Sequence, residues 1–175
     1  DEDRARSLER IHHQCAWLER FSGKLTSLVV LQRDFSKKPE SVARLFEFVR
    51  EAVSDSLQSN GIEFRVSCRI NTLYMDFDLM ASALFNLIDN ARKASNPGAV
   101  IRLYAHDNVI EVKDYGKGIP ADEIAHITEP FYMVDRSRNK KYGGTGLGLA
   151  IVKRIIEVHG AQMKIISELG QGTTV

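Results

Sequence analysis

Residues 143–148 form a glycine-rich loop directly before an apolar segment, with the sequence Gly143-Gly144-Thr145-Gly146-Leu147-Gly148. Because glycine reaches positive φ freely, successive backbone N–H groups in such a loop can converge on an anion. A helix that begins at the loop adds the positive end of its dipole. The spacing matches neither a P-loop nor the dinucleotide-binding fingerprint. The loop predicts a different kind of phosphate site, with a turn that only caps a buried helix as the alternative.

A second candidate is a polar stripe on a helix predicted over residues 78–94, capped by Asp76 or Asp78. At about 100° per residue, Asn86, Asn90 and Lys93 fall within about 60° of one another. The apolar residues expected on the other side are Met80, Leu84, Leu87, Ile88 and Ala91. Asparagine is a poor helix former, so two of them here need a reason. A carboxamide oxygen can ligate Mg²⁺ and a lysine can neutralise a phosphate, whereas a solvated face is the alternative.

A third candidate is the segment Asp114-Tyr115-Gly116-Lys117-Gly118-Ile119-Pro120, which follows a predicted strand. Its carboxylate can accept a hydrogen bond from an amino group such as adenine N6. Its two glycines would let a ring lie close to the backbone. An ordinary Asp-x-Gly turn is the alternative.

Further helices are expected on both sides of these segments. Residues 8–28 repeat apolar side chains at three- and four-residue steps, which predicts a long helix with one apolar seam. A partner chain is expected to cover this seam, so we predict a homodimer through this helix. Pro39, Glu40 and Ser41 favour the start of a second helix that runs to about residue 57. The last helix is expected from about residue 146 to residue 158.

The strands are expected between these helices. Alternating or short apolar runs predict them at residues 62–68, 72–75, 100–104, 109–112, 163–167 and 173–175. His106-Asp107-Asn108 is expected to join two of them in a hairpin. Because strands and helices are intermixed with hairpins, we predict an α/β (α+β) fold, a two-layer sandwich of a mixed β-sheet and helices.

Composition limits the classes of function. The 175 residues are 43% hydrophobic and 27% charged with a net charge of +1, so no overall field favours nucleic acid. The two cysteines, Cys15 and Cys68, lack metal-ligand spacing and favour a reducing compartment. No apolar run approaches the length of a membrane span. We expect a cytoplasmic segment whose membrane anchor, where one exists, lies outside these residues.

Taken in order, these segments resemble the nucleotide-binding domain of sensor histidine kinases, which belong to the GHKL ATPase superfamily with the Bergerat fold. Residues 84–94 resemble the N box, 114–119 the G1 box, 129–132 the F box, 144–149 the G2 box and 170–173 the terminal glycine-threonine turn. The resemblance extends over roughly residues 40 to 175.

This resemblance implies roles for individual residues. Asn90 would hold Mg²⁺, with Asn86 and Lys93 as catalytic groups near the metal and phosphates, and Asp114 would read the adenine of ATP. The other implied nucleotide-binding residues are Gly116, Gly118, Ile119, Phe131, Tyr132, Arg136, Arg138, Gly144, Thr145, Gly146, Leu147, Gly148 and Thr173. The stretch between Phe131 and Gly144 would be a mobile lid over ATP.

One position in the lid departs from the family pattern. Met133 stands where many members carry an arginine that is aimed at the γ-phosphate. Arg136 or Arg138 is expected to supply this charge instead, and the sequence leaves both open.

Residues 1–37 resemble the second helix of the dimerisation and phosphotransfer hairpin, and residues 38–175 resemble the catalytic ATP-binding domain. The phosphoacceptor histidine belongs to the first helix of that hairpin, in a His-Glu/Asp-x-x-x-Pro setting. His12 and His13 do not match this setting, so we expect the acceptor outside this segment.

The implied function is protein-histidine kinase activity, with a response regulator receiver domain as the later phosphate acceptor. ATP hydrolases of the same superfamily place a glutamate one turn before the metal-binding asparagine, where this sequence has Asn86. Two alternatives stay open. One is ATP hydrolysis with Asp89 as the base, and the other is a binding or scaffold module without catalysis.

Overall fold

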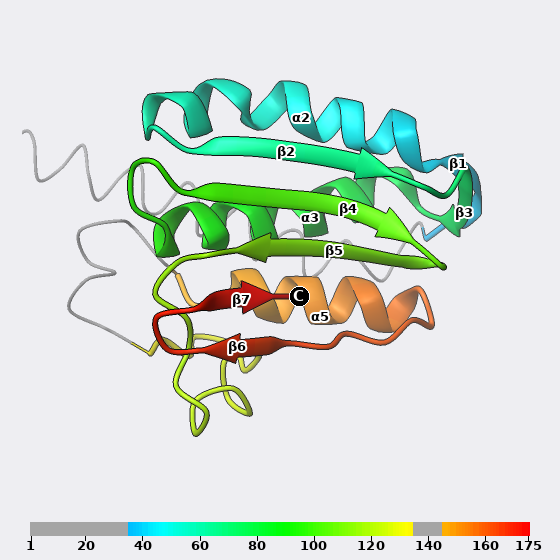
Figure 1. Ribbon diagram of the computed structural model, residues 1–175. Helices are drawn as coiled ribbons and strands as arrows, with labels where there is room; N and C mark the ends of the chain where they lie inside the picture. Colours follow the sequence, from blue (N-terminus) through cyan, green and yellow to red (C-terminus); the bar gives the residue numbers. More distant parts are fainter. Residues whose placement is uncertain (1–34, 135–144) are drawn as a thin grey trace, which may run out of the picture.

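A computed structural model describes residues 35–134 and 145–175, in which helices pack on one face of a main sheet (Figure 1). The elements are β1 (Lys38–Ser41), α2 (Val42–Ser59), β2 (Glu63–Cys68), β3 (Thr72–Met75), α3 (Phe77–Ala94), β4 (Val100–His106), β5 (Val109–Asp114), α5 (Gly148–Val158), β6 (Ile166–Glu168) and β7 (Gly172–Thr174). The helix expected over residues 8–28, with Cys15, His12 and His13, lies outside the described residues.

The main sheet has five strands in the order β2-β4-β5-β7-β6. β2 runs parallel to β4, and the other neighbouring strands are antiparallel, so the sheet is mixed. Helices α3 and α5 lie behind it in Figure 1, and α2 follows the edge formed by β2. The predicted two-layer sandwich is therefore confirmed.

Local signals predicted α3 correctly. Of the two possible caps it is Asp76 that caps the helix, because its side chain accepts a hydrogen bond from the backbone N–H of Leu79 at 3.1 Å. The hairpin between β4 and β5 also forms as predicted, with Asp107 and Asn108 at positive φ in its turn. Both strands extend two residues beyond the prediction, so Asp114 is the last residue of β5.

The start of the second helix was predicted wrongly. Residues Lys38–Ser41 form β1, which pairs with β3 in a separate two-stranded antiparallel sheet. The helix begins only at Val42, where the Ser41 hydroxyl accepts a hydrogen bond from the N–H of Arg44. Pro39 is tolerated in a short edge strand, and its partner Tyr74 is too distant in sequence for a local pattern to indicate.

The last helix and β6 also begin later than predicted. Gly146 has a φ of +68°, which is incompatible with a right-handed helix, so α5 starts at Gly148. Residues 163–165 form no strand, and β6 covers only Ile166–Glu168.

The core lies between the sheet and the helices. On β4 the buried residues Ile101, Leu103 and Ala105 alternate with exposed or half-buried ones. They belong to one apolar cluster with Ile88 of α3 and Ile151 of α5. Burial of each large aliphatic side chain contributes about 1.5–3 kcal/mol, so α3 and α5 are held firmly against the sheet.

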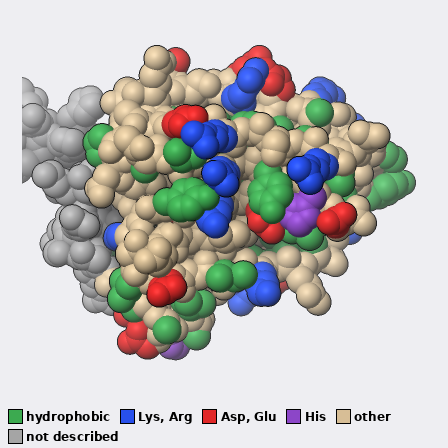
Figure 2. Space-filling view, in the orientation of Figure 1, with side chains coloured by type: hydrophobic (Ala, Val, Ile, Leu, Met, Phe, Trp, Pro, Cys, Tyr) green, Lys and Arg blue, Asp and Glu red, His purple; other side chains and the backbone are tan. Residues whose placement is uncertain are grey.

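The other face of the sheet is open. In Figure 2 this face carries scattered basic and apolar side chains, and none of the described helices covers it. The Arg102 guanidinium lies 5.5 Å and the Lys113 ammonium 4.9 Å from the ring centre of Tyr115. This face therefore has the mixed polar character of a solvated surface. Within the described residues, no helix is both long and apolar enough to cross a bilayer.

His159 joins the end of α5 to the start of the domain. Its Nε2 accepts a hydrogen bond from the backbone N–H of Asp76 at 3.0 Å, and its Nδ1 lies 2.7 Å from the carbonyl of Ile155. The Lys37 ammonium donates to the carbonyl of His159, and the Phe35 ring packs edge-on at 4.9 Å. The entering chain thus meets the N-terminus of α3 and the C-terminus of α5 at one point.

Candidate active site

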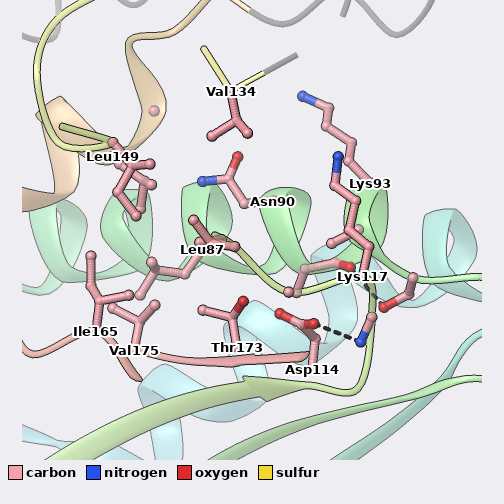
Figure 3. Close-up of a pocket in the computed structure, with 18 of the residues that line it drawn as sticks. Leu87, Asn90, Lys93, Asp114, Lys117, Val134, Leu149, Ile165, Thr173 and Val175 are labelled. Carbon is pink, nitrogen blue, oxygen red and sulfur yellow. Dashed lines mark hydrogen bonds between the residues drawn. The ribbon is translucent and has the colours of Figure 1, made fainter. Parts of the chain in front are cut away.

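A cavity of about 600 Å³ lies between α3, the ends of β5 and β7, and the loops that follow β5 and precede α5. Figure 3 shows Asn90 and Lys93 on one side of it and Asp114 and Thr173 on the other. We call the part around Asp114, Gly116, Ile119 and Thr173 the strand end, and the part around Asn90, Lys93, Gly146 and Gly148 the helix end. The cavity therefore joins two of the predicted motifs directly to the glycine loop.

Asp114 is the central group of the strand end. Its side chain is buried, with 5% of the residue exposed, and its Oδ1 accepts a hydrogen bond from the N–H of Gly116 at 2.8 Å. Burial raises the pKa of Asp114, while backbone hydrogen bonds from Gly116 and Thr173 oppose that rise. A buried carboxylate held in this way is a fixed acceptor at the bottom of the cavity.

Apolar side chains form the walls around this acceptor. They are Leu87, Val112, Ile127, Leu149, Ile165 and Val175. A flat heteroaromatic ring would bury its faces against such walls and present an N–H edge to Asp114. Leu87 was expected among the core residues, and it both packs against the core and lines the cavity.

The helix end presents a carboxamide and two ammonium groups. Asn90, Lys93 and Lys117 all line the cavity, and Figure 3 labels each of them. Asp114 is the only acidic side chain in the described lining, so the charged side chains that line the helix end are both cationic. Lys117 was missed by the sequence analysis, although its place between two glycines could have indicated it.

Lys93 already has a partner. Its Nζ lies 2.6 Å from Asp89 Oδ2, and Arg92 binds the other oxygen of this carboxylate at 2.8 Å. Burial opposes the charge of Asp89, but these two cations more than offset it and hold the pKa of Asp89 below its usual range. Asp89 does not line the cavity, and a carboxylate of lowered pKa is a weak base.

Asn86 lies apart from the other two members of the polar stripe. It does not line the cavity, and its Nδ2 donates to the carbonyl of Ser82 at 2.9 Å. Its Oδ1 faces Gly148, where an added Cβ would lie 3.3 Å away. Asn86 therefore contacts the first residue of α5 rather than the cavity.

Gly146 is required by a close approach of two backbone segments. It has a φ of +68°, and an added Cβ would lie 2.6 Å from the carbonyl carbon of Phe131. Phe131, itself at a φ of 66°, donates its N–H to the carbonyl of Gly146 at 2.9 Å. This contact joins the predicted F box to the glycine loop. Next to it, Thr145 Oγ1 is buried without a hydrogen-bond partner among the described residues.

Most of the predicted nucleotide-binding residues line this single cavity. They are Asn90, Lys93, Asp114, Gly116, Gly118, Ile119, Tyr132, Thr145, Gly146, Gly148 and Thr173. Leu147 instead lies fully buried in the apolar core, and Phe131 is 55% exposed outside the lining. Met133 lies within the described residues, whereas Arg136, Arg138 and Gly144 lie outside them.

Comparison with known proteins gives a matching family, curated relatives and similar solved structures. Residues 75–175 match the family described as histidine kinase-, DNA gyrase B-, and HSP90-like ATPase. The chain is 34% identical over 144 residues to the sensor protein SrrB of Staphylococcus aureus, an alignment that covers 79% of this chain. The chain spans about a quarter of the length of this curated relative, since the alignment covers 25% of it.

Two solved structures have the same fold and are identical to this chain at more than a quarter of the aligned positions. The mycobacterial sensor histidine kinase MprB is 26% identical with a TM-score of 0.67, over 79% of this chain and 93% of that one. Full-length ShkA, solved in complex with AMPPNP, is 27% identical with a TM-score of 0.72, over 89% of this chain and 34% of that one.

Proposed function

The chain belongs to the histidine kinase-, DNA gyrase B-, and HSP90-like ATPase family, and from this premise we propose that it is the catalytic ATP-binding part of a sensor histidine kinase. One observation carries the proposal. A single cavity holds a buried carboxylate suited to a base at one end and a carboxamide with two ammonium groups suited to phosphates at the other. The similarity to SrrB and MprB supports a kinase within the wider family.

The strand end would bind adenine. Asp114 would accept a hydrogen bond from the exocyclic amine, and the apolar walls would cover the ring faces. Gly116, Gly118 and Ile119 would let the ring approach their backbone. This half of the site would supply affinity and base selectivity without taking part in the chemistry.

The residues of the helix end fit a magnesium site built together with phosphates. No group of three His, Cys, Asp or Glu side chains in the described parts of the chain could hold a metal ion by itself. Mg²⁺ commonly takes one or two protein oxygens and fills its other positions with phosphate and water, so the Asn90 carboxamide would be its protein ligand. Bound there, Mg²⁺ would offset the phosphate charge.

Other groups at the helix end would hold the phosphates in place. Lys93 would exchange Asp89 for a phosphate oxygen, and Lys117 would approach from the opposite wall. The buried Thr145 hydroxyl, which has no hydrogen-bond partner within residues 35–134 and 145–175, would be available to a phosphate oxygen. The N–H groups at the start of α5 would add the positive end of its dipole. Either Arg136 or Arg138 would supply the charge that Met133 lacks.

Phosphoryl transfer mainly requires positioning and charge stabilisation, because its transition state is loose. We propose that a neutral imidazole nitrogen attacks the γ-phosphorus, the bond to the bridging oxygen breaks, and ADP leaves. The acceptor histidine would lie outside this segment. A response regulator receiver domain would then take the phosphoryl group from that histidine.

The proposal also covers the organisation of the protein. Residues 1–37 would be a helix of the dimerisation and phosphotransfer hairpin and would form a homodimer, and residues 38–175 would be the catalytic domain. The site would work in the cytoplasm, where ATP and the receiver domain are available, and any membrane contact would come from other parts of the full-length protein.

Labelling with [γ-³²P]ATP and Mg²⁺ tests the kinase proposal. The full-length protein should gain label that is stable in base and lost in acid, as expected for phosphohistidine, and a receiver domain should then remove it. The 175-residue chain alone should bind ATP in a magnesium-dependent manner by calorimetry without becoming labelled. Failure of the full-length protein to form an acid-labile phosphoprotein would contradict the kinase assignment.

Two rival functions predict different results in the same experiments. An ATP hydrolase would release phosphate steadily from this chain, reduced in Asp89→Asn, but Asp89 is paired with two cations and lies outside the cavity lining. A scaffold without catalysis would bind no ATP, and Asn90→Ala and Asp114→Ala would then behave like the parent. The intact cavity favours neither rival.

A further inference from the structure

We propose that Ser167, which does not line the cavity, is a positioning residue that turns the Thr173 hydroxyl so that the strand end offers only hydrogen-bond acceptors to the base. This inference deepens the proposed function and rests on it. Ser167 is the middle residue of β6 and lies directly opposite Thr173 of β7. Thr173 lines the cavity, so Ser167 would act through it.

The Ser167 hydroxyl has three neighbours at hydrogen-bond distance. It accepts from the backbone N–H of Ile119 at 2.9 Å and donates to the carbonyl of Gly172 at 2.9 Å. Its third neighbour is Thr173 Oγ1, also at 2.9 Å. A hydroxyl oxygen can make three such bonds, with one proton to give and two lone pairs to receive.

Counting protons fixes the direction of the third bond. A backbone N–H can only donate and a carbonyl can only accept, so the single proton of Ser167 goes to Gly172. At the contact between the two hydroxyls Ser167 must therefore accept, and Thr173 must donate. The Thr173 proton then points at Ser167 and away from the cavity, so only lone pairs of Thr173 face the base.

β7 also fixes the second acceptor of the strand end, which is Asp114 of β5. The backbone N–H of Thr173 bonds to the Asp114 carboxylate, which also accepts from Gly116. Asp114 and the Thr173 hydroxyl therefore form one wall of acceptors. Such a wall favours a base that carries an amine with two N–H groups at its 6-position, and it rejects a base with a carbonyl oxygen there, because two acceptors would face each other.

Ser167 also fixes the loop that forms the floor of the strand end. Gly118, at a φ of +67°, packs so closely on β6 that an added Cβ would lie 1.9 Å from the carbonyl oxygen of Glu168. The N–H of Gly170 donates to the carbonyl of Lys117 at 2.8 Å. Ser167 adds a side-chain hydrogen bond to this contact between backbones, because its hydroxyl oxygen accepts a hydrogen bond from the N–H of Ile119.

The test compares ATP with inosine triphosphate, which differs from ATP in having a carbonyl in place of the 6-amine. Calorimetry with Mg²⁺ gives both dissociation constants for the parent, Ser167→Ala and Ser167→Thr. Ser167→Ala should reduce the preference for ATP about tenfold, because the freed Thr173 hydroxyl can turn and donate to the carbonyl. Ser167→Thr keeps the hydroxyl and should retain the parent's preference.

A double-mutant cycle tests whether Ser167 acts through Thr173. Thr173→Val removes the oriented hydroxyl, so adding Ser167→Ala to it should not change the preference between the two nucleotides further. The proposal is wrong if Ser167→Ala weakens the binding of both nucleotides equally, so that the ratio of their dissociation constants stays at the parent value. It is also wrong if Ser167→Ala changes this ratio by the same factor in the Thr173→Val background, because the Thr173 hydroxyl would then not set the selectivity.

Hydrogen exchange provides a readout without nucleotide. In the free protein the amide of Ile119 should exchange at least about tenfold faster in Ser167→Ala than in the parent, and at the parent's rate in Ser167→Thr. Unchanged protection in Ser167→Ala would overturn the proposed contact. A parent that binds neither nucleotide would instead refute the proposed function, while the exchange data would still decide what Ser167 bonds.

Discussion

The two ends of the cavity are built in different ways. At the strand end the polar groups are fixed by backbone bonds from neighbouring strands and loops, as when Gly116 donates to Asp114. At the helix end, Lys93 of α3 instead forms an ion pair with Asp89 of the same helix. Asp114 is therefore held in place by backbone groups, whereas Lys93 would have to leave Asp89 to contact a ligand.

This difference separates the two tasks of a nucleotide site. Recognition of the base requires a rigid wall, because a misplaced acceptor is an unsatisfied buried group. Handling of the phosphates requires groups that can change partners during a reaction cycle. Lys93 is suited to this, since its ion pair with Asp89 is partly exposed and so costs little to break. Variants that damage one end should therefore leave the other end measurable.

The largest effect is expected from Asn90→Ala, which removes the carboxamide from the helix end. Magnesium-dependent phosphoryl transfer in the full-length protein should fall about 100-fold or more, because the group that would order the metal and phosphates is lost. Adenosine should bind as it does to the parent. Asn86→Ala is the matched control on the same helix, and its effect should be smaller because Asn86 lies outside the lining. Equal losses in the two variants would contradict this assignment.

Asp114→Asn damages the strand end alone. Affinity for adenosine should fall about 10- to 100-fold, because one acceptor of a charged buried hydrogen bond becomes an N–H donor. Binding of tripolyphosphate with Mg²⁺ should not change, and calorimetry measures both. Glu111→Gln serves as control, since Glu111 belongs to the same strand but is only partly buried and pairs with His106. Loss of tripolyphosphate binding in Asp114→Asn would show that the two ends are not separable.

Gly146→Ala tests the contact that joins the glycine loop to the segment around Phe131. We expect a loss of about 1–3 kcal/mol in the free energy of unfolding, because the new Cβ sits at positive φ and against backbone. Gly98→Ala is the control that separates the steric clash from the backbone strain, since Gly98 also has positive φ but nothing lies within 4 Å of its added Cβ. Urea unfolding should show a smaller loss for Gly98→Ala. Similar losses would mean that φ strain alone decides.

The smallest effect concerns pH, and its sign should differ between the two carboxylates. The pKa of Asp114 is raised, so its contribution to stability is present below the ordinary pKa of the group and is lost as pH rises through the raised value. The pKa of Asp89 is lowered, so its contribution is present above the ordinary value and is lost as pH falls through the lowered one.

This contrast is measured by urea unfolding at about pH 3 and about pH 7, which lie below and above the ordinary pKa of an aspartate. Asp114→Asn should gain stability relative to the parent on going to neutral pH. Asp89→Asn should lose stability there, by less than about 1 kcal/mol because its ion pairs are partly exposed. Shifts of the same sign would show that one of the two carboxyl environments is assigned wrongly.

The sequence could predict features that depend on nearby residues. The helix α3 and its polar stripe follow from helical periodicity, and capping chemistry limited its cap to Asp76 or Asp78, of which the structure has Asp76. The strand β1 could not be predicted in this way, because Pro39 needs Tyr74 as its partner. The site shows the same limit. The stripe placed Asn86 and Asn90 on one face, but only the packing of α5 on α3 decides that Asn86 meets Gly148.

The bond between His159 and Asp76 has a mechanical consequence. α3 and α5 run antiparallel, so the ends gathered at His159 are those farthest from Lys93 and Gly148. An 18-residue helix such as α3 is about 27 Å long and barely compresses along its axis. A displacement of residues 35–37 would therefore act on both helices at once, because Phe35 and Lys37 contact His159 where α3 begins and α5 ends.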